Sequence, residues 1–448
     1  MQDSLRRVKD TLLDELCDWL RIPSISSGGG DPADLQRAAE WACERIVAAR
    51  GRAEVESGFG NPLCVGELRS RRAGAPTVLI YGHYDVQSPD PIALWTSDPF
   101  DPVIRGGRLY ARGASDDKGN FLPLLHVACA LARAGELPVH VRVVLEGEEE
   151  IGGQNAARYL AEDERGADCA LVFDGSMIDE RNPAIHLAVR GIVAAHLRVR
   201  TAERDLHSGV YGGVALNAAH ALSQMLAQVL PGPDGRLREE LRAGVARPGR
   251  EEVASWKQLP AGAEVLAAAG AGEVAPGAAA ELYARTWADA SLDLHGIESG
   301  DAVQRRTIIP CTASARFSVR LALGQSADGV ATALERILRE AAPAGTEVEL
   351  DVDPSEPAGF DPSDPALVLA REAIGRAAGS RPLLVRTGGS IPILAAFAGR
   401  GIPTVLSGFA LDSDGIHGPD ESYRLESLEL GERAARELYA ALATLTPK

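Results

Sequence analysis

A run of glutamates raises the question of what chemistry this chain performs. The stretch LEGEEEIGG (145–153) places four carboxylates within five positions. They are Glu146, Glu148, Glu149 and Glu150. Directly before them, VHVRVVL (139–145) is apolar and rich in β-branched residues, which predicts a buried strand. Like charges gathered at the end of a core strand repel one another unless a positive group lies between them.

The ordinary interpretation of such a charge run is a solvated turn, and Glu146 and Glu148 fit that interpretation in part. Side chains at a strand end alternate between two faces, however, so all four carboxylates cannot easily reach water. One carboxylate could bind a metal ion while its neighbour stays free to accept a proton. Metal-assisted hydrolysis needs this pairing of roles.

Polar clusters also follow the other predicted strands, and chemistry in open α/β sheets gathers at the carboxyl ends of strands. His83 and Asp85 in GHYDVQ stand at positions i and i+2, which directs both side chains to one face of an extended segment. A carboxylate commonly orients a metal-binding histidine through its second ring nitrogen. Taken alone, this spacing is equally compatible with a structural histidine.

Adjacent aspartates precede a predicted helix at 119–134. Helix capping accounts for one of Asp116 and Asp117, and the other could bridge two cations. Asp174 follows the predicted strand 169–173, and His417 lies in SDGIHGPDES (413–422) after the last strand. Each would be an ordinary loop residue on its own, but chance does not explain their shared position at successive strand ends.

The donor set defines the kind of metal site. It offers two imidazoles and several carboxylates, which suit Zn²⁺, Mn²⁺ or Co²⁺ in a reactive site rather than a structural zinc site built on thiolates. Five ligands that share one carboxylate fit two ions about 3.5–4 Å apart. The six cysteines are scattered without CxxC spacing, so they predict reduced side chains and neither disulfides nor a thiolate site.

The elements that must position these residues alternate between helix and strand over 1–185, as in an α/β domain with a mostly parallel sheet. From 186 the pattern changes: HLAVRGIVAAHLRVR (186–200) predicts paired strands, and later segments continue as an α+β insert with a poorly patterned Ala/Gly/Pro-rich stretch at 231–280. The α/β pattern resumes at 359. We therefore predict one discontinuous domain, 1–185 with 359–448, interrupted by a second domain at 186–358.

Composition bounds the class of protein. A chain of 448 residues with 45% hydrophobic and 24% charged residues predicts a globular protein of two domains. The net charge of −17 argues against nucleic acid or an anionic membrane as partner. No apolar run reaches bilayer-spanning length, and the charged N-terminus has no signal-peptide core. A cytoplasmic location is expected.

Seven motifs in colinear order resemble metallopeptidase family 20, and within it the branch of carnosinases and cytosolic non-specific dipeptidases. They are GHYDVQ, RGASDDKG, EGEEEIGG, FDGS, DLHSGVYGG (205–213), RTGGSIP (386–392) and DGIHG. The resemblance spans nearly the whole chain. It implies a catalytic α/β domain with a mostly parallel sheet flanked by helices, interrupted by an α+β, ferredoxin-like lid that also forms a dimer.

The resemblance implies a role for each ligand of a two-metal centre. Asp116 would bridge two divalent ions, Zn²⁺ or Mn²⁺. His83 and Asp174 would complete the shell of one ion, and Glu150 and His417 that of the other. The family also implies a cis peptide bond between Asp116 and Asp117.

Catalytic and substrate-binding residues follow from the same resemblance. Glu149 would be the general base, and Asp85 would orient His83. His207 would reach the active site of the partner in a homodimer and stabilise the oxyanion there. The terminal carboxylate of the substrate would be held by residues of RTGGS and of the insert. They are Arg386, Gly389, Ser390, Arg320 and Thr307.

The expected function is that of a di-metal hydrolase that cleaves dipeptides or very short peptides with a free C-terminal carboxylate, through a metal-bridging water that a glutamate activates. An N-acyl amino acid deacylase or carboxypeptidase with the same metal centre is the alternative within enzymes. A non-catalytic metal or peptide binder is the alternative outside them, but no ligand and no base is missing. A serine hydrolase is disfavoured because GxSxG is absent.

Overall fold

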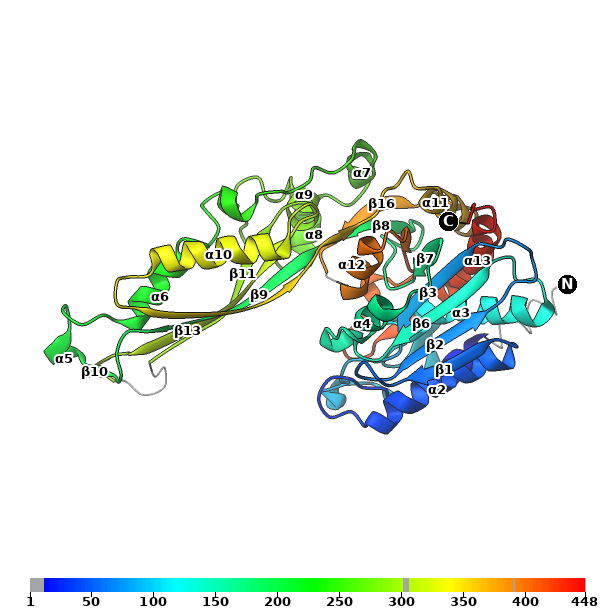
Figure 1. Ribbon diagram of the computed structural model, residues 1–448, viewed down its shortest axis with the longest axis horizontal. Coiled ribbons are helices and arrows are strands. Elements are labelled where there is room, and N and C mark those ends of the chain that lie inside the picture. The colour runs from blue at the N-terminus through cyan, green and yellow to red at the C-terminus, as the bar shows by residue number, and fades with distance from the viewer. Residues whose placement is uncertain (1–11, 301–305, 390, 448) are drawn as a thin grey trace. The chain divides into compact units, whose positions relative to one another are not determined.

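A computed structural model describes residues 12–300, 306–389 and 391–447 of the chain. These residues form two compact units (Figure 1). The first unit runs up to Leu187 and includes Phe360–Val385 and the residues from Ile391 onward, whereas the second is built on Ala188–Gly359 and a short segment that starts at Arg386. The sequence-based division, at 185/186 and 358/359, assigned this short segment to the first domain.

The first unit is built around a nine-stranded sheet in the order β1-β2-β6-β3-β7-β17-β8-β15, with β16 paired to β8. The neighbours β6, β3, β7 and β17 are parallel, and the outer pairs are antiparallel. The predicted α/β class with a mostly parallel sheet is therefore confirmed. The strands are β1 Arg52–Glu56, β2 Leu63–Leu68, β3 Thr77–His83, β6 His140–Glu146, β7 Cys169–Val172, β8 Ala184–Val189, β15 Ala358–Gly359, β16 Leu383–Thr387 and β17 Thr404–Leu406.

Helices flank this sheet, and their ends carry local sequence signals. The carboxylates of Asp31 and Asp364 accept hydrogen bonds from the main-chain N–H two residues later, and a proline follows each aspartate. Gly135, in the left-handed conformation at φ 75°, ends the helix that follows the paired aspartates. The helices are α2 Pro32–Ala48, α3 Lys118–Ala134, α4 Asn155–Glu162, α11 Pro365–Ala378, α12 Pro392–Gly399 and α13 Leu425–Leu442.

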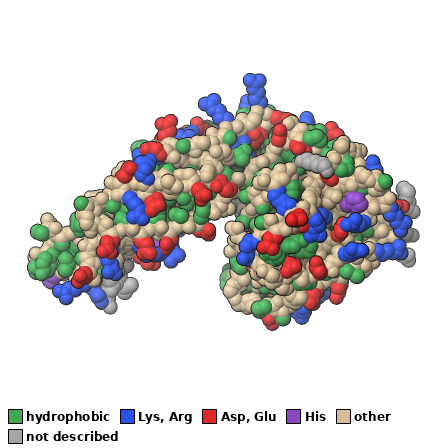
Figure 2. Space-filling model, viewed as in Figure 1, with side chains coloured by type: hydrophobic (Ala, Val, Ile, Leu, Met, Phe, Trp, Pro, Cys, Tyr) green, Lys and Arg blue, Asp and Glu red, His purple; other side chains and the backbone are tan. Residues whose placement is uncertain are grey.

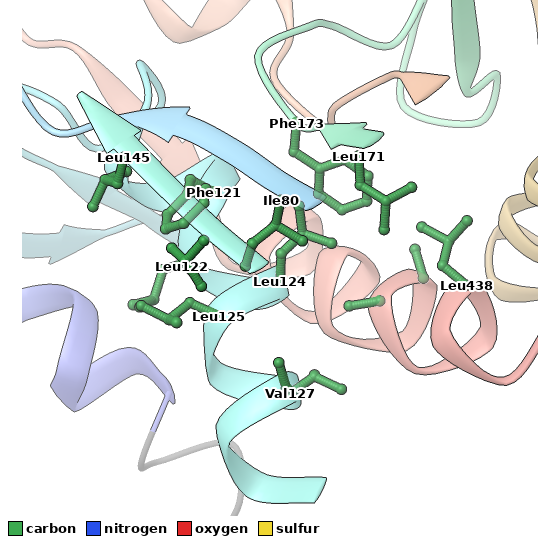
Figure 3. Packing of buried hydrophobic residues seen from close by; sticks show 14 of the residues in the cluster. Ile80, Phe121, Leu122, Leu124, Leu125, Val127, Leu145, Leu171, Phe173 and Leu438 are labelled. Atoms are coloured by element: carbon green, nitrogen blue, oxygen red, sulfur yellow. The ribbon is translucent and has the colours of Figure 1, made fainter. Parts of the chain in front are cut away.

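The hydrophobic core lies between the sheet and helices α3, α11 and α13, which pack on one another. In Figure 3, Phe121 and Leu124 of α3 lie against Ile80 of β3, with Leu438 of α13 nearby. These side chains are fully buried, so α3 is held at a fixed position under the sheet. The paired aspartates that precede α3 are thereby fixed beside the carboxyl end of β3.

Short elements complete the first unit. A three-stranded sheet, in the order β18-β5-β4, joins the chain near residue 110 to the chain near residue 423. Its strands and the short 3₁₀ helices are β4 Val103–Arg105, β5 Arg108–Tyr110, β18 Ser422–Arg424, η1 Ile92–Leu94, η2 Glu149–Ile151 and η4 Asp412–Asp414. Among the described residues, no helix combines the length and the apolarity that a membrane span requires.

The second unit contains a four-stranded antiparallel sheet in the order β11-β13-β9-β14. With helices α6 and α10 between the strands, the chain order is β-α-β-β-α-β, the ferredoxin-like arrangement. Its elements are β9 Gly191–Arg200, β10 Leu206–His207, α5 Ser208–Tyr211, α6 Ala218–Leu226, η3 Glu239–Leu241, α7 Arg250–Trp256, α8 Gly262–Ala268, α9 Leu282–Trp287, β11 Ser291–Ser299, β12 Ile308–Ile309, β13 Thr312–Leu321, α10 Ala327–Ala341 and β14 Glu347–Ser355.

Two local expectations differ from the structure. The segment 186–200 was expected to form paired strands, but β8 belongs to the nine-stranded sheet and β9 to the four-stranded one. Arg190 separates them, so the chain leaves one sheet and enters the other at this residue. The stretch 231–280, which had no clear pattern, forms the short helices η3, α7 and α8.

Candidate metal centre

Two histidines meet one aspartate at the carboxyl end of the central sheet. His83 is the last residue of β3, and its Nε2 lies 3.0 Å from Oδ1 of Asp116. Nε2 of His417 lies 3.1 Å from the other oxygen of Asp116, Oδ2, and 3.1 Å from Oε2 of Glu150. Asp116 therefore presents one carboxylate oxygen to each histidine, which is the arrangement that a bridging ligand requires.

Donor atoms of His83, Asp116 and Glu150 lie within 4.8 Å of one another, close enough to share one ion. A cis peptide bond joins Asp116 to Asp117, as the resemblance implies. The main-chain N–H of His83 donates to Oδ2 of Asp117 at 3.3 Å, so Asp117 is held by the strand whereas Asp116 faces the two histidines.

Asp85 connects the histidine to the glutamate run. The main-chain oxygen of Asp85 lies 3.0 Å from Nδ1 of His83, and its carboxylate Oδ1 lies 3.5 Å from the same nitrogen. The Asp85 carboxylate accepts hydrogen bonds from the main-chain N–H groups of Glu149 (3.3 Å) and Glu150 (3.1 Å). Asp85 thus fixes the ring of His83 and the turn that carries both glutamates.

The four glutamates of the run divide into two pairs. Glu149 and Glu150 face the cluster of histidines and aspartates, whereas Glu146 is 3% exposed and accepts a hydrogen bond from the Tyr81 hydroxyl. Glu146 is therefore not part of a solvated turn, contrary to the sequence-based expectation. The carboxylate of Glu148 accepts hydrogen bonds from the main-chain N–H groups of Asn61, Gln154 and Asn155, and these contacts fix the start of α4.

Electrostatics at the cluster follow from an excess of carboxylates in a buried place. Burial, together with the charges of Asp116 and Glu150, raises the pKa of Glu149 to about 7 against the lowering effect of His83. Burial also raises the pKa of Asp174 well above its usual range, with Glu149 and Asp116 among the contributing charges. Asp174 therefore lies within electrostatic reach of the same cluster.

The histidines respond in the opposite direction. Hydrogen bonds with Asp116 and then Glu150 raise the pKa of His417 to about 10. Burial opposes the protonation of His83, but Asp116 and Asp85 raise its pKa well above the usual value. Burial likewise opposes ionisation of Asp116, yet the two histidines lower its pKa.

The cluster fits divalent cations. Two imidazoles face five carboxylates, so even two protonated rings leave an excess of negative charge in a mostly buried site. The carboxylates are those of Asp85, Asp116, Glu149, Glu150 and Asp174. Nitrogen and oxygen donors without a thiolate are the set that Zn²⁺ and Mn²⁺ accept in catalytic sites.

Two buried acids that support this cluster were quoted within a motif but not predicted as functional. They are Asp414 and Glu421, on either side of His417, and both have no more than 1% of their surface exposed. Their position on either side of a candidate ligand histidine is the sequence signal that could have identified them. Their partners lie some 300 residues earlier in the chain, so the sequence alone does not identify their contacts.

Comparison with known proteins decides the family. Residues 79–441 match the family described as Peptidase family M20/M25/M40. The chain belongs to this peptidase family. A cysteinylglycine-S-conjugate dipeptidase of Corynebacterium striatum is 32% identical over 360 residues, which cover 78% of this chain and 77% of that protein. A Beta-Ala-His dipeptidase of Homo sapiens is 29% identical over 349 residues, or 75% of this chain and 68% of that protein.

Solved structures agree with this assignment. The M20 family metallo-carboxypeptidase Sso-CP2 from Sulfolobus solfataricus has a TM-score of 0.86 and 26% identity, and the match covers 97% of this chain and 99% of that one. The resemblance to the M20 family and to its dipeptidase branch is thereby confirmed. The chain is a metallopeptidase.

In this M20 peptidase, His207 and Thr307 lie together in the second unit. His207 of β10 pairs with Ile308 of β12, and the main-chain N–H of Ser208 donates to the oxygen of Thr307 at 3.1 Å. Both His207 and Thr307 are exposed. The imidazole Nδ1 of His207 accepts a hydrogen bond from the N–H of Gly209 at 3.0 Å. This hydrogen bond does not involve the second ring nitrogen, Nε2.

The other described residues predicted for substrate binding, which are Arg320, Arg386 and Gly389, also belong to the second unit of the M20 peptidase. Arg320 on β13 lies within electrostatic reach of Arg190, whose main-chain N–H donates to the oxygen of Gly389 at 3.1 Å. Ser390 lies outside the described residues. Arg320 and Gly389 are therefore both associated with Arg190, the residue at which the chain passes between the two sheets.

Arg386 already has a carboxylate partner within the protein. Its Nε donates to Oε1 of Glu252 at 2.7 Å and its Nη2 to Oε2 at 3.1 Å, a bidentate pair that is almost completely buried. The guanidinium also lies over the ring of Trp256, 5.9 Å from its centre. Of the three guanidinium nitrogens of Arg386, only Nη1 has no hydrogen-bond partner among the described residues. Arg386 thus has one nitrogen, rather than a planar fork, left for a ligand.

Replacing Glu252 with glutamine should destabilise the protein by about 3–5 kcal/mol, because the buried charge of Arg386 would lose its counter-ion. The amide keeps the size of the side chain, so the loss reports charge rather than packing. Urea unfolding of the variant measures the change. Glu273→Gln, at an exposed position of the same stretch, is the control and should change stability by less than about 0.5 kcal/mol. Equal stability of the two variants would contradict the prediction.

Proposed function

We propose that this metallopeptidase is a dipeptidase, which hydrolyses dipeptides or very short peptides with a free C-terminal carboxylate. The observation that carries the proposal is the position of Asp116, whose two oxygens face His83 and His417 separately, with Glu149 beside them. The names of the relatives, a cysteinylglycine-S-conjugate dipeptidase and a Beta-Ala-His dipeptidase, support the choice of substrate class.

Two divalent cations, Zn²⁺ or Mn²⁺, are the proposed cofactors. His83 and Asp174 would hold one cation, Glu150 and His417 the other, and Asp116 both. When bound, such cations polarise the scissile carbonyl and lower the pKa of an attacking water from 15.7 toward about 7. Asp85 would hold the His83 ring in place through the second ring nitrogen, as ligand histidines require.

Glu149 would act as the general base. Its main-chain N–H donates to Asp85, and among the described residues no arginine or lysine forms an ion pair with its carboxylate, so the carboxylate is available for a proton. Glu149 would accept the proton of the attacking water and then donate it to the leaving amine. A carboxyl group whose pKa lies near neutrality is suited to both transfers.

The second unit would recognise the substrate and complete the reaction. Arg320, Thr307, Gly389 and Ser390 would hold the terminal carboxylate, and Nη1 of Arg386 would add a single hydrogen bond to it. His207 would stabilise the oxyanion in the active site of a partner subunit. The α5 end of this unit exposes apolar side chains beside His207, which supports a homodimer (Figure 2). They are Val210, Tyr211, Val214 and Leu216.

A carboxypeptidase or N-acyl amino acid deacylase is the second candidate, because the structurally similar Sso-CP2 is a metallo-carboxypeptidase. Both candidates use the same metal centre and differ in the group that precedes the scissile bond. A dipeptidase needs space for one residue with a free amine, whereas a deacylase takes an acyl group.

Metal analysis combined with a substrate panel tests the proposal. We expect protein stripped with a chelator to be inactive, and to regain activity when about two equivalents of Zn²⁺ or Mn²⁺ have been bound. The panel contains dipeptides, the same dipeptides as C-terminal amides, and acylated amino acids. Dipeptides should have the highest kcat/KM, and their amides at least about tenfold less, because a charge-assisted hydrogen bond contributes about 1.5–3 kcal/mol. Turnover of the acylated amino acids alone would favour the second candidate.

A further inference from the structure

Glu421 has a fully buried carboxylate, which forms several hydrogen bonds with the loop that leads to Asp116. It accepts hydrogen bonds from the main-chain N–H groups of Gly113 (3.0 Å), Ser115 (2.9 Å) and Asp116 (3.1 Å). Nη1 of Arg112 donates to the same carboxylate at 2.7 Å. Arg112 thereby balances the charge of Glu421, and three main-chain N–H groups within residues 113–116 are fixed to one side chain.

Strand pairing explains why Glu421 lies beside this loop. Ser422 of β18 is paired with Tyr110 of β5, and the N–H of Ala111 donates to the main-chain oxygen of Glu421 at 3.1 Å. The residues just before β18 therefore run alongside the residues just after β5. This antiparallel register places position 421 opposite the loop 111–116, whatever the length of chain between them.

The same interactions reach His417. Nη2 of Arg112 donates to the main-chain oxygen of Gly418 at 3.2 Å, so the arginine that pairs with Glu421 also holds the residue after the histidine. Asp414 adds a second tie between the two loops, since it accepts a hydrogen bond from the Ser115 hydroxyl at 3.0 Å. His417 itself has a φ of 62°, a conformation that its loop must maintain.

His83 is positioned by other means. It ends β3, where it is paired with Glu146 of β6, and its ring nitrogen Nδ1 lies 3.0 Å from the oxygen of Asp85. None of these contacts involves the loop 411–421. The two imidazoles that face Asp116 are thus supported by separate parts of the fold.

We propose that Glu421 is a positioning residue that sets the spacing between Asp116 and His417, and thereby controls the affinity of the cation held by Glu150 and His417 more than that of the cation held by His83 and Asp174. The inference rests on the proposed two-metal centre. Glu421 itself would contact neither cation, because its four hydrogen bonds go to Arg112 and to main-chain N–H groups. Its effect on metal binding acts through the Asp116 main chain and the His417 loop.

Glu421→Gln tests the proposal, because the amide nitrogen cannot accept the hydrogen bonds that the carboxylate oxygen accepts. Metal-free wild type, Glu421→Gln, His83→Ala and His417→Ala are titrated with Mn²⁺ or Zn²⁺ by calorimetry, together with dipeptide hydrolysis by the wild type. We expect Glu421→Gln to weaken one of the two binding steps by about 10–100-fold. Its titration should resemble that of His417→Ala and differ from that of His83→Ala. Glu437→Gln, in a surface ion pair of α13, should bind both ions as the wild type does.

A role in stability alone would weaken both binding steps equally, and this result would overturn the proposal, as would two unchanged affinities. Circular dichroism checks that each variant is folded. If Glu421→Gln does not fold, Glu421→Asp, which keeps the charge but is shorter by one methylene, replaces it, with the same two outcomes. Wild type that does not bind two cations or does not cleave dipeptides would instead refute the proposed function, so the two failures are distinguishable.

Discussion

Glu149→Gln is expected to lower kcat for dipeptide hydrolysis by about 10²–10⁴-fold while two cations remain bound, because the amide cannot accept the proton of the attacking water. In the proposed mechanism, Glu149 has the only role that requires a carboxylate to accept a proton. Its neighbours Asp85 and Glu150 keep their contacts when the side chain becomes an amide, so KM should change much less than kcat.

Steady-state kinetics and metal analysis of the same sample provide the measurement. Glu162→Gln, at an exposed position at the end of α4, is the matched control and should retain the kinetics of the wild type. An active Glu149→Gln variant with normal metal content would assign the base to another residue. A variant that had lost its metal would instead make Glu149 a ligand.

Asp116→Asn is expected to reduce the metal content from two ions to one or none, and kcat/KM by more than about 10³-fold, because two-metal chemistry needs both ions. The side chain of asparagine presents one acceptor oxygen and one donor nitrogen, and it carries no charge. It can face one cation but not two. Divalent ions about 3.5–4 Å apart also repel each other strongly unless an anion lies between them.

Metal analysis after dialysis, together with kinetics at saturating Mn²⁺, tests this expectation. Asp412→Asn, at an exposed position near His417, is the control for the loss of one negative charge in this region. Two tightly bound ions in Asp116→Asn would remove Asp116 from the bridging position. A variant that regains full turnover at high Mn²⁺ would show that the aspartate raises affinity but is not needed for the reaction.

Much of the cluster was predictable because each member follows a strand. Apolar segments such as 139–145 identify parallel strands, and the ends of such strands must converge, so His83 and Glu150 could be placed together without coordinates. The residues alone indicated that one of the two adjacent aspartates could bridge two cations, but the choice of Asp116 required the family resemblance. Glu421 was not predicted as functional because three of its four hydrogen-bond partners are main-chain N–H groups, which carry no sequence signature, and because the β5–β18 pairing joins residues that are distant along the chain.

The second unit was less predictable for related reasons. Alternating apolar residues at 186–200 indicate strands, but they do not specify which sheet each strand joins, and Arg190 separates β8 from β9. The stretch 231–280 is rich in small residues and its helices are short, so its apolar residues show no helical periodicity. The pairing of Glu252 with Arg386 is consequently invisible in the sequence, although it decides how much of that arginine remains available to a ligand.

The interrupted first unit has a consequence for the time at which the enzyme gains activity. Asp116 and His417 are separated by the whole second unit and by most of the α/β sheet that follows it. A ribosome must therefore synthesise the whole second unit before the imidazole of His417 can meet Asp116. A nascent polypeptide that ends before residue 417 lacks this imidazole, so the proposed metal centre cannot be complete in it and no peptide hydrolysis is expected from it.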